Sequence, residues 1–294
     1  MKVGVIGIGI MGTSIARNLI AGGSSVAGYD IDESRLAALR QAGGEPLPSA
    51  AAVARACEIV LTSLPSAAAL DDAVAGPRGL LSAARKGQLV AELSTLPIEV
   101  KERNRLALEA AGITLLDCPL SGTGAQAVTR DLAVFASGER AAFDRAAPVF
   151  AQFARVSHYL GAFGNGSRMK FVANLLVAIH NVATAEAMVL GIKAGLDPEM
   201  ITKVIASGAG NSRVFELRAP LMAARRYEPP SMKIDVWQKD MAIIGSFAAG
   251  LGVATPLFAA SAPVYNAAVG LDLGGKDTAA VCAVLERMAG LVRD

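Results

Sequence analysis

The chain has 294 residues, more than one small core needs and enough for two domains. Hydrophobic residues make up 53% of it and charged residues 18%, a composition that excludes a disordered chain. The formal net charge is +2 and the lysines and arginines are scattered, so nothing indicates nucleic acid or an acidic membrane surface as a partner.

The cysteines and histidines limit the chemistry further. Three cysteines lie far apart in the sequence, at Cys57, Cys118 and Cys282. An odd number without a C-x-x-C pair argues against a disulfide framework and is typical of a reducing cytoplasm. His158 and His180 have no second His or Cys at ligand spacing, so we expect no metal site. Since the chain opens directly into an apolar run at residues 3–6, we expect no signal peptide and a cytoplasmic location.

Six short apolar runs in the first half predict β-strands. They are Lys2–Ile6, Ser25–Tyr29, Ile59–Ser63, Leu89–Glu92, Thr114–Asp117 and Leu132–Ser137. Helical patterns lie between most of them, at Gly12–Ala21, Ser34–Ala42, Ser49–Ala56, Ala67–Val74 and Pro97–Ala111. Strands that alternate with helices predict a parallel sheet covered on both faces, the doubly wound α/β class.

After about Gly161 the pattern becomes helical. Helices are expected near Ser167–Ala194, Pro198–Ser207, Arg213–Ala224, Met232–Ala249, Pro256–Val269 and Asp277–Leu291. We therefore predict a sheet domain over residues 1–162 and an all-α domain over 163–294, joined by the first of these helices. That helix is uncharged over residues 171–185, and a second subunit would bury it more easily than this chain alone, so we expect a homodimer or homotetramer.

A second uncharged stretch, Met241 to Leu271, is long enough to suggest a membrane span. Gly250, Gly252 and Pro256 interrupt it near the middle, however. Two buried helices joined by a turn are therefore the better interpretation, and we expect no membrane partner.

The segment from Gly7 to Gly12 has the form G-x-G-x-x-G, with Ile10 and Met11 inside it. It follows an apolar strand and opens a helix, which is the context of a dinucleotide-binding turn. Gly7 would permit the tight turn, Gly9 would let the backbone approach the diphosphate, and Gly12 would let helix and strand pack closely. The helix N-terminus would then bind the diphosphate. The alternative is an ordinary strand–helix turn.

Asp30 follows the second strand at the distance expected for a ribose-binding acid. A carboxylate there accepts hydrogen bonds from both ribose hydroxyls and repels a 2′-phosphate, which favours NAD over NADP. Arg35 is close enough in sequence to weaken this preference. The alternatives for Asp30 are a solvated loop residue or a helix N-cap.

Lys170 and Asn174 lie one turn apart on one face of the long helix. A lysine among Met169, Phe171 and Val172 is a candidate for a lowered pKa and hence for proton transfer. The alternative is a lysine whose amine reaches out to solvent.

At this point the whole chain resembles the β-hydroxyacid dehydrogenases, the family of 3-hydroxyisobutyrate dehydrogenase, tartronate semialdehyde reductase and 6-phosphogluconate dehydrogenase. Six motifs in family order carry the resemblance: residues 7–12, Ser63-Leu64-Pro65, Glu92-Leu93-Ser94-Thr95, Asp117-Cys118-Pro119-Leu120-Ser121-Gly122-Thr123, residues 164–174 and Lys239-Asp240. The resemblance implies a Rossmann-type first domain, an all-α second domain and a nicotinamide cofactor.

The resemblance also implies roles for individual residues. Lys170 would be the general acid/base on the substrate oxygen, and Asn174 would position the substrate or that lysine. Ser121 and Gly122 would hold the substrate carboxylate.

Three further roles follow from the same resemblance. Lys239 would lie near substrate and nicotinamide, and Asp240 would support it. Leu64, Pro65 and Thr95 would line the cofactor cleft. Read without the resemblance, Lys239 and Asp240 could equally be an exposed charge pair.

Two positions depart from the family pattern. Members commonly have Ser-Gly-Gly where this chain has Ser121-Gly122-Thr123, and often an asparagine where it has Ala173. Thr123 adds bulk and a hydroxyl beside the proposed carboxylate loop. With Asn211 and Ser212 in a segment that looks like that of L-threonate dehydrogenases, it would suit a polyhydroxylated acid, although helix capping also explains Asn211 and Ser212.

The expected function is therefore NAD-dependent oxidation of a small 3-hydroxy or polyhydroxy carboxylic acid, of the 3-hydroxyisobutyrate, L-threonate or glycerate type. The same fold could act instead as a reductase of tartronate or succinate semialdehyde. An imine reductase shares the architecture but usually replaces the lysine. A non-catalytic dinucleotide-binding module is disfavoured because Lys170, Asn174, Ser121 and Lys239 occur together.

Overall fold

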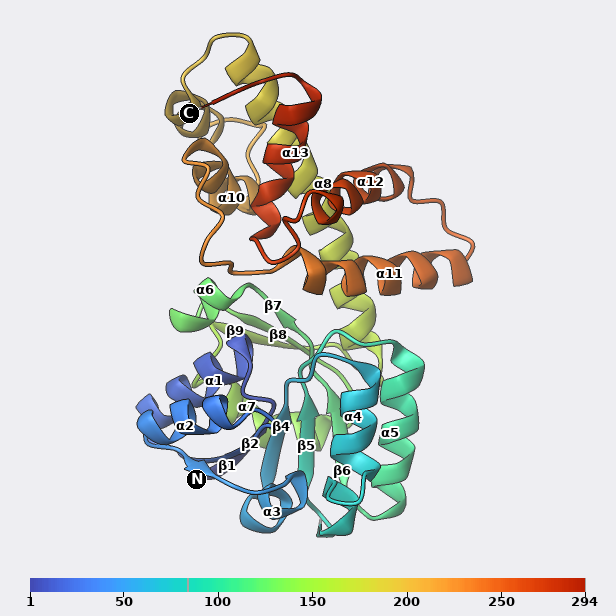
Figure 1. The fold of residues 1–294 in the computed structure, drawn as a ribbon. Helices are drawn as coiled ribbons and strands as arrows, with labels where there is room; N and C mark the ends of the chain where they lie inside the picture. Colours follow the sequence, from blue (N-terminus) through green and yellow to red (C-terminus); the bar gives the residue numbers. More distant parts are fainter. Residues whose placement is uncertain (84, 294) are drawn as a thin grey trace. The chain divides into compact units, whose positions relative to one another are not determined.

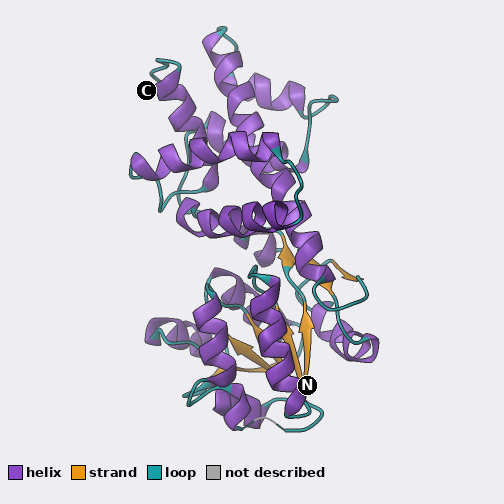
Figure 2. Cartoon of the chain, turned by 90° about the vertical axis from the view of Figure 1, so that its right-hand side faces the viewer, coloured by secondary structure: helices purple, strands orange, loops and turns teal. Residues whose placement is uncertain are grey.

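The structure, a computed structural model, describes residues 1–83 and 85–293, so Asp294, the last residue of the expected second domain, lies outside it. The chain packs into two compact units, Met1–Lys170 and Phe171–Asp294. Figure 2 shows strands and helices in the first unit and helices in the second, as the sequence predicted. The boundary expected between residues 162 and 163 remains a prediction.

The first unit is built on a six-stranded parallel sheet with the order β3-β2-β1-β4-β5-β6 (Figure 1). Its strands are β1 (Lys2–Ile6), β2 (Ser25–Tyr29), β3 (Glu45–Pro46), β4 (Ile59–Thr62), β5 (Leu89–Glu92) and β6 (Thr114–Asp117). The order reverses direction at β1 and β4, which makes the sheet doubly wound and confirms the expected Rossmann-type fold.

Alternate residues of the five strands other than β3 enter two separate cores. Val3, Val5 and Leu61 pack on one face against α1 (Ile10–Ala21), α2 (Glu33–Gln41) and α7 (Arg140–Phe150). On the other face Val60 and Val90 pack against α3 (Ala50–Ala56), α4 (Ala67–Ala75) and α5 (Ile98–Ala110). Because both faces are covered, the strands read as continuous apolar runs, which is why the sequence revealed them.

The strand predicted at residues 132–137 does not join this sheet. It forms β8 (Ala133–Ala136) in a three-stranded sheet with β7 (Leu120–Ser121) and β9 (Val156–Tyr159). The parallel sheet has six strands because β3, which the sequence did not predict, pairs with β2. A short helix, α6 (Gly124–Val128), and a 3-10 turn, η1 (Leu80–Ser82), complete the unit. The sequence missed β3 and β7 because each has two residues, and β9 because it is only partly buried.

The second unit is helical. It contains most of α8 (Asn165–Lys193), then α9 (Pro198–Ile205), α10 (Arg213–Ala223), α11 (Ile234–Gly250), α12 (Pro256–Gly270), η2 (Thr278–Ala280) and α13 (Val281–Met288). The stretch from Met241 to Leu271 thus falls on two helices with a turn between them, as predicted. The expected burial of this stretch is wrong for the single chain, since Leu257 is 67% and Val269 41% exposed. The core of the second unit includes Ile234, Ala268 and Val284.

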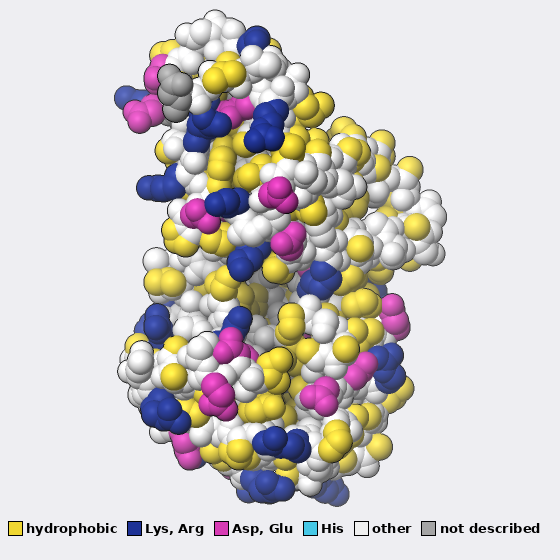
Figure 3. Space-filling model, viewed as in Figure 1, with side chains coloured by type: hydrophobic (Ala, Val, Ile, Leu, Met, Phe, Trp, Pro, Cys, Tyr) yellow, Lys and Arg dark blue, Asp and Glu magenta, His cyan; other side chains and the backbone are white. Residues whose placement is uncertain are grey.

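Helix α8 is the one helix of the described residues that is long and apolar enough to cross a membrane, and 44% of its most apolar window is buried. A core helix of a globular protein passes the same test, so this is weak evidence for a span. Within the single chain α8 is not buried all round, because Val172 is 56% and Leu190 73% exposed. Figure 3 shows uncharged and hydrophobic side chains over α12, where Leu257 and Val269 are also exposed.

Candidate active site

The glycine turn after β1 needs glycine at two positions. Gly7 has a φ of +90°, and a Cβ there would collide with the carbonyl oxygen of Ser63. A Cβ on Gly12 would collide with the carbonyl oxygen of Gly7. The turn therefore allows strand, helix and the neighbouring β4 loop to approach one another more closely than any side chain would permit.

The first turn of α1 suits an anion. Gly9 is its N-cap residue, and no side chain of the described residues caps the turn or adds an acidic group to it. A Cβ on Gly9 would meet only the end of the flexible Arg35 side chain, 3.0 Å away. Free backbone N–H groups and the positive end of the helix dipole thus fit a diphosphate.

Asp30 lies directly beside this turn. Its Oδ2 accepts a hydrogen bond from the Ile8 N–H at 2.6 Å, and its Oδ1 accepts one from the Asp32 N–H at 2.9 Å. The N-cap of α2 is Asp32 and not Asp30, since Asp32 accepts from the Ser34 N–H. Arg35 also reaches the turn and donates to the Ile8 carbonyl at 3.3 Å.

The other motif segments emerge at the same edge of the sheet. The loops that begin with Ser63, Leu93 and Cys118 follow the carboxyl ends of β4, β5 and β6, which are neighbours in the sheet. In a doubly wound sheet this edge, where the strand order reverses, is where ligands bind. The Leu64 N–H donates to the Ser94 Oγ at 2.7 Å and so joins two of these loops.

The Ser121–Gly122 loop begins at β7, where Ser121 pairs with Ala133. Gly122 has a φ of +130°, a conformation that strongly favours glycine. Thr123, the departure from the family pattern, is the N-cap of α6, and its N–H donates to the Gln126 Oε1 at 3.1 Å. A capping role thus accounts for this threonine without the substrate.

Asn211 and Ser212 also have local partners. The Ser212 Oγ accepts from the Phe215 N–H at 3.0 Å and caps α10. The Asn211 amide donates to the Ala206 carbonyl and to Glu216, each at 2.9 Å. The structure therefore supports the capping alternative for Ser212, whereas Asn211 bonds to the carbonyl of Ala206 and to the side chain of Glu216.

Lys170 lies in the second turn of α8 and is 7% exposed, so it is not the solvent-exposed lysine of the alternative interpretation. Asn174 follows one turn later on the same helix and is also buried. Its amide N–H donates to the Asp240 Oδ2 at 2.9 Å.

Asp240 also binds Lys239. Their charged atoms, Oδ1 and Nζ, are 3.2 Å apart, and the Asp240 side chain is only 6% exposed. The carboxylate is therefore buried, whereas the Lys239 side chain is 31% exposed, so only Asp240 departs from the exposed charge pair that most such neighbours form. The Asp240 carboxylate therefore binds both the Asn174 amide and the Lys239 amine, two groups that are candidates for contact with the substrate.

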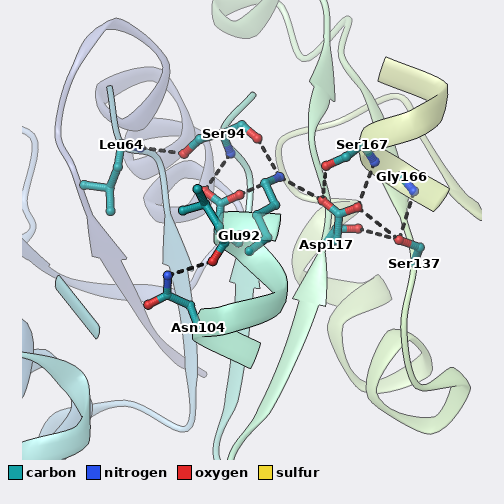
Figure 4. A network of polar contacts seen from close by, with 10 residues as sticks. Leu64, Glu92, Ser94, Asn104, Asp117, Ser137, Gly166 and Ser167 are labelled. Atoms are coloured by element: carbon teal, nitrogen blue, oxygen red, sulfur yellow. Dashed lines mark hydrogen bonds and ion pairs between the residues drawn. The ribbon is translucent and has the colours of Figure 1, made fainter. Parts of the chain in front are cut away.

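A buried ionic cluster that the sequence did not reveal lies behind the loops at the sheet edge (Figure 4). Glu92 and Asp117 end β5 and β6 as register partners. The Lys101 Nζ from α5 lies 2.6 Å from the Glu92 Oε2 and 2.8 Å from the Asp117 Oδ1, and none of the three side chains is more than 1% exposed. Burial alone would lower the pKa of Lys101, but the charges of Asp117 and Glu92 outweigh it and raise that pKa.

One sequence signal could have indicated this cluster. Glu92 and Asp117 each follow a pair of buried apolar strand residues, and two carboxylates at the ends of adjacent parallel strands need a cation between them. Which cation provides it depends on how α5 is rotated. Because α5 carries several positively charged residues, its sequence does not indicate which of them faces the two carboxylates.

Metal and thiol chemistry have little support. Among residues 1–83 and 85–293, no group of three or more His, Cys, Asp or Glu side chains is placed to hold a metal ion. The cysteines are unpaired and buried. Burial raises the pKa of Cys57 to about 11 and that of Cys282 to about 12, so both are protonated thiols at neutral pH.

Comparison with known proteins decides the family. The sequence model of the NAD binding domain of 6-phosphogluconate dehydrogenase matches residues 2–161. The model for the NAD-binding domain of NADP-dependent 3-hydroxyisobutyrate dehydrogenase matches residues 164–285. The chain belongs to the β-hydroxyacid dehydrogenase family. The expected family, the nicotinamide-dependent oxidoreductase class and the presence of an NAD-binding domain are thereby confirmed.

Individual β-hydroxyacid dehydrogenases match nearly the whole chain. L-threonate dehydrogenase of Cupriavidus necator is 34% identical over 95% of this chain and 94% of its own length. The 2-hydroxy-3-oxopropionate reductase of Escherichia coli is 30% identical over 98% of each chain. The crystal structure of 3-hydroxyisobutyrate dehydrogenase from Salmonella typhimurium has a TM-score of 0.88 at 29% identity and covers 97% of this chain and 99% of its own.

Proposed function

We propose that the protein is an NAD-dependent dehydrogenase of small 3-hydroxy or polyhydroxy carboxylic acids, with Lys170 as its general acid/base. The observation that carries the proposal is the burial of Lys170 one turn before Asn174, whose amide is fixed by the buried Asp240. A buried amine close to a fixed amide is restricted in position, which suits a group that must accept and return a proton at one atom of the substrate.

The chain's residues divide the work as follows. Lys170 takes the proton of the substrate hydroxyl, and Asn174 and Lys239 orient the substrate. Ser121 and the backbone of Gly122 bind its carboxylate. The dinucleotide is held by the glycine turn and by the loops after β4 and β5, through Gly7, Gly9, Ile10, Met11, Gly12, Leu64, Pro65 and Thr95. When bound, NAD supplies the carbon that receives the hydride from the alcohol.

The preference for NAD over NADP rests on Asp30. Its carboxylate lies beside the glycine turn and would repel a 2′-phosphate. Arg35 also lies next to Gly9 and Ile8 and favours NADP, so the preference should be incomplete. Steady-state rates with NAD and NADP for wild type and Asp30→Ala test this, and an unchanged ratio of kcat/KM would contradict it.

L-Threonate is the first substrate to test. It is the substrate named for the Cupriavidus relative, and the chain resembles that relative over nearly its full length. We propose comparing L-threonate, D-glycerate, 3-hydroxyisobutyrate and 4-hydroxybutyrate with NAD. A preference for 3-hydroxyisobutyrate over L-threonate would contradict a polyhydroxylated substrate.

Reduction of a semialdehyde is the second candidate, because the Escherichia coli relative is a 2-hydroxy-3-oxopropionate reductase. The same residues serve both directions, since Lys170 would donate the proton that it accepts during oxidation. NADH oxidation with tartronate and succinate semialdehyde measures this activity in the same preparation.

The deciding variant is Lys170→Ala. Loss of a positioned general acid/base lowers kcat by about 10²–10⁴-fold, whereas NADH binding should stay unchanged. Lys193→Ala, at the other end of α8, is the matched control and should retain full activity. If Lys170→Ala retains the wild-type rate, Lys170 is not the general acid/base. A wild type without turnover on any acid or semialdehyde would leave a non-catalytic nucleotide-binding protein.

We also propose a cytoplasmic homodimer or homotetramer. The exposed apolar side chains of α8, such as Val172, Leu176 and Leu190, support self-association. The unpaired cysteines fit a reducing compartment. Light scattering at micromolar concentration tests the assembly, and a monomer would contradict it.

A further inference from the structure

The Lys101 cluster carries one positive and two negative charges, and the excess negative charge is balanced by the start of α8. The Ser167 N–H donates to the Asp117 Oδ2 at 2.7 Å, and the Ser167 Oγ donates to the Oδ1 at 2.8 Å. Backbone N–H groups in the first turn of a helix have no intrahelical partner and lie at the positive end of its dipole. Asp117 therefore anchors the first turn of α8, three residues before Lys170.

A second hydroxyl strengthens this anchor. The Ser137 Oγ lies 3.3 Å from the Asp117 Oδ2, and it accepts a hydrogen bond from the Gly166 N–H at 2.9 Å. Figure 4 shows Asp117 between Ser137 and Ser167. Two successive backbone N–H groups of α8 are thus bound to the end of β6 and to the residue that follows β8.

The other side of the cluster holds the loops proposed to bind the dinucleotide. The Lys101 Nζ donates to the Ser94 carbonyl at 2.7 Å, and the Ser94 N–H donates to the Glu92 Oε1 at 2.9 Å. The Ser94 Oγ in turn accepts from the Leu64 N–H. One ammonium group therefore joins the loops after β4 and β5 to the first turn of α8, and every residue of this network lies in the first unit.

We propose that Lys101 is a positioning residue of the reaction. It sets the Lys170 amine relative to the loops proposed to bind the dinucleotide, by holding Asp117 on one side and Ser94 on the other. This role rests on the proposed function. Because displacement of a reacting group by about 1 Å can cost about 10²-fold in rate, small losses in this network should appear in catalysis.

Two serine variants test the two sides without changing any charge. Ser167→Ala removes the hydroxyl that binds Asp117, so kcat should fall by about 10-fold or more while the Kd of NADH, from fluorescence titration, stays unchanged. Ser94→Ala removes the acceptor of the Leu64 N–H and should raise the Kd of NADH several-fold.

Ser24→Ala is the matched control. Ser24 is also buried and its hydroxyl donates to the Gln152 Oε1 at 2.8 Å, but it precedes β2 at the opposite edge of the sheet. All three variants lose one buried hydrogen bond and should show similar small decreases in Tm. Only the two network variants should change kcat or the Kd of NADH.

The double variant Ser94→Ala/Ser167→Ala tests whether Lys101 joins the two sides. Sites that share a network give non-additive effects, so the fold-loss in kcat/KM should differ from the product of the single losses, whereas Ser24→Ala/Ser167→Ala should give that product. Two results would overturn the role of Lys101 and leave the proposed function standing. One is a Ser167→Ala enzyme with the wild-type kcat, and the other is a fold-loss in the Ser94→Ala/Ser167→Ala variant that equals the product of the two single losses. A wild type that turns over nothing overturns the proposed function, and this role with it.

Discussion

A buried ionic cluster lies in each unit of the molecule, and the Lys101 cluster of the first unit differs from the Arg218 cluster of the second in what it holds. In the first unit Lys101 lies between two carboxylates, Glu92 and Asp117. In the second unit Arg218 binds one carboxylate, Asp277, with 2.6 Å between the Nη1 and the Oδ1. Both clusters have almost no exposure to solvent, so burial does not distinguish them.

Their hydrogen-bond partners do distinguish them. The Asp277 carboxylate accepts from the N–H groups of Ser231 and Ala279, and thereby fixes the segment before α11 and the turn η2. None of its described partners is a residue proposed for the active site. The Lys101 cluster is bonded to Ser94 and Ser167, which belong to two of the family motifs. A buried charge indicates function only through the segments that it joins.

Removal of either cation should have the largest effect and tests the comparison directly. Lys101→Met and Arg218→Met each leave buried carboxylates uncompensated, so each should lower the free energy of unfolding by about 3–5 kcal/mol. Urea unfolding followed by circular dichroism measures this loss. Fluorescence of Trp237, the only tryptophan, reports the second unit separately.

The two variants should differ in cofactor binding at temperatures where both are folded. Lys101→Met should weaken NADH binding because the Ser94 loop loses its anchor, whereas Arg218→Met should bind NADH as the wild type does. Equal weakening in both variants would remove the functional distinction between the clusters.

Isosteric changes of the carboxylates should have a smaller effect. In Asp117→Asn and Asp277→Asn, one side of the new amide faces a donor whichever way it is turned, since both oxygens of each carboxylate accept hydrogen bonds. Each variant should lose about 1–3 kcal/mol. Turnover should fall for Asp117→Asn alone, and a fall of similar size in Asp277→Asn would contradict the comparison.

Alkaline pH should separate the clusters without mutation. The pKa of Lys101 is raised in the folded protein, so its stabilisation is complete below the unfolded lysine pKa of about 10.4 and decreases as the pH rises through the folded value. An arginine guanidinium does not lose its proton in proteins. The difference in unfolding free energy between wild type and Lys101→Met should therefore narrow above about pH 10.4, and that between wild type and Arg218→Met should stay constant.

A cap at the edge of the second unit should give the smallest effect. Ser212→Ala removes the N-cap of α10 and should cost about 1 kcal/mol, as caps typically do. If Ser212 acts only as a cap, the ratio of kcat/KM for L-threonate and 3-hydroxyisobutyrate should not change. A changed ratio would show that this hydroxyl also contacts the substrate.

Much of the first unit could be predicted because its strands and its glycine turn are each formed by residues that are close together in the sequence. The strands are apolar on both faces, and the glycines sit where a Cβ would collide with backbone, so both leave a local pattern. The same reasoning failed for β9, whose alternating side chains are partly exposed and polar, and for β3, which has too few residues to show a period.

The site itself could be predicted only in part. Asp30 and Gly7 belong to one local motif, and the structure joins the Asp30 carboxylate to the backbone of Ile8. The Asn174–Asp240 bond and the Lys101 cluster each join residues of different elements. Such pairs depend on how helices are rotated and packed, which no local pattern in a single sequence records.

Helix α8, which begins in the first unit and continues into the second, also determines where the chain can be divided into fragments. Two of the hydrogen bonds to Asp117 come from Ser167, which lies beyond the expected domain boundary after residue 162. A truncated polypeptide that ended at residue 162 would keep the acidic ends of β5 and β6 but lose these donors. A nucleotide-binding fragment that keeps these donors must therefore extend into α8 beyond Ser167, and the first compact unit ends at Lys170.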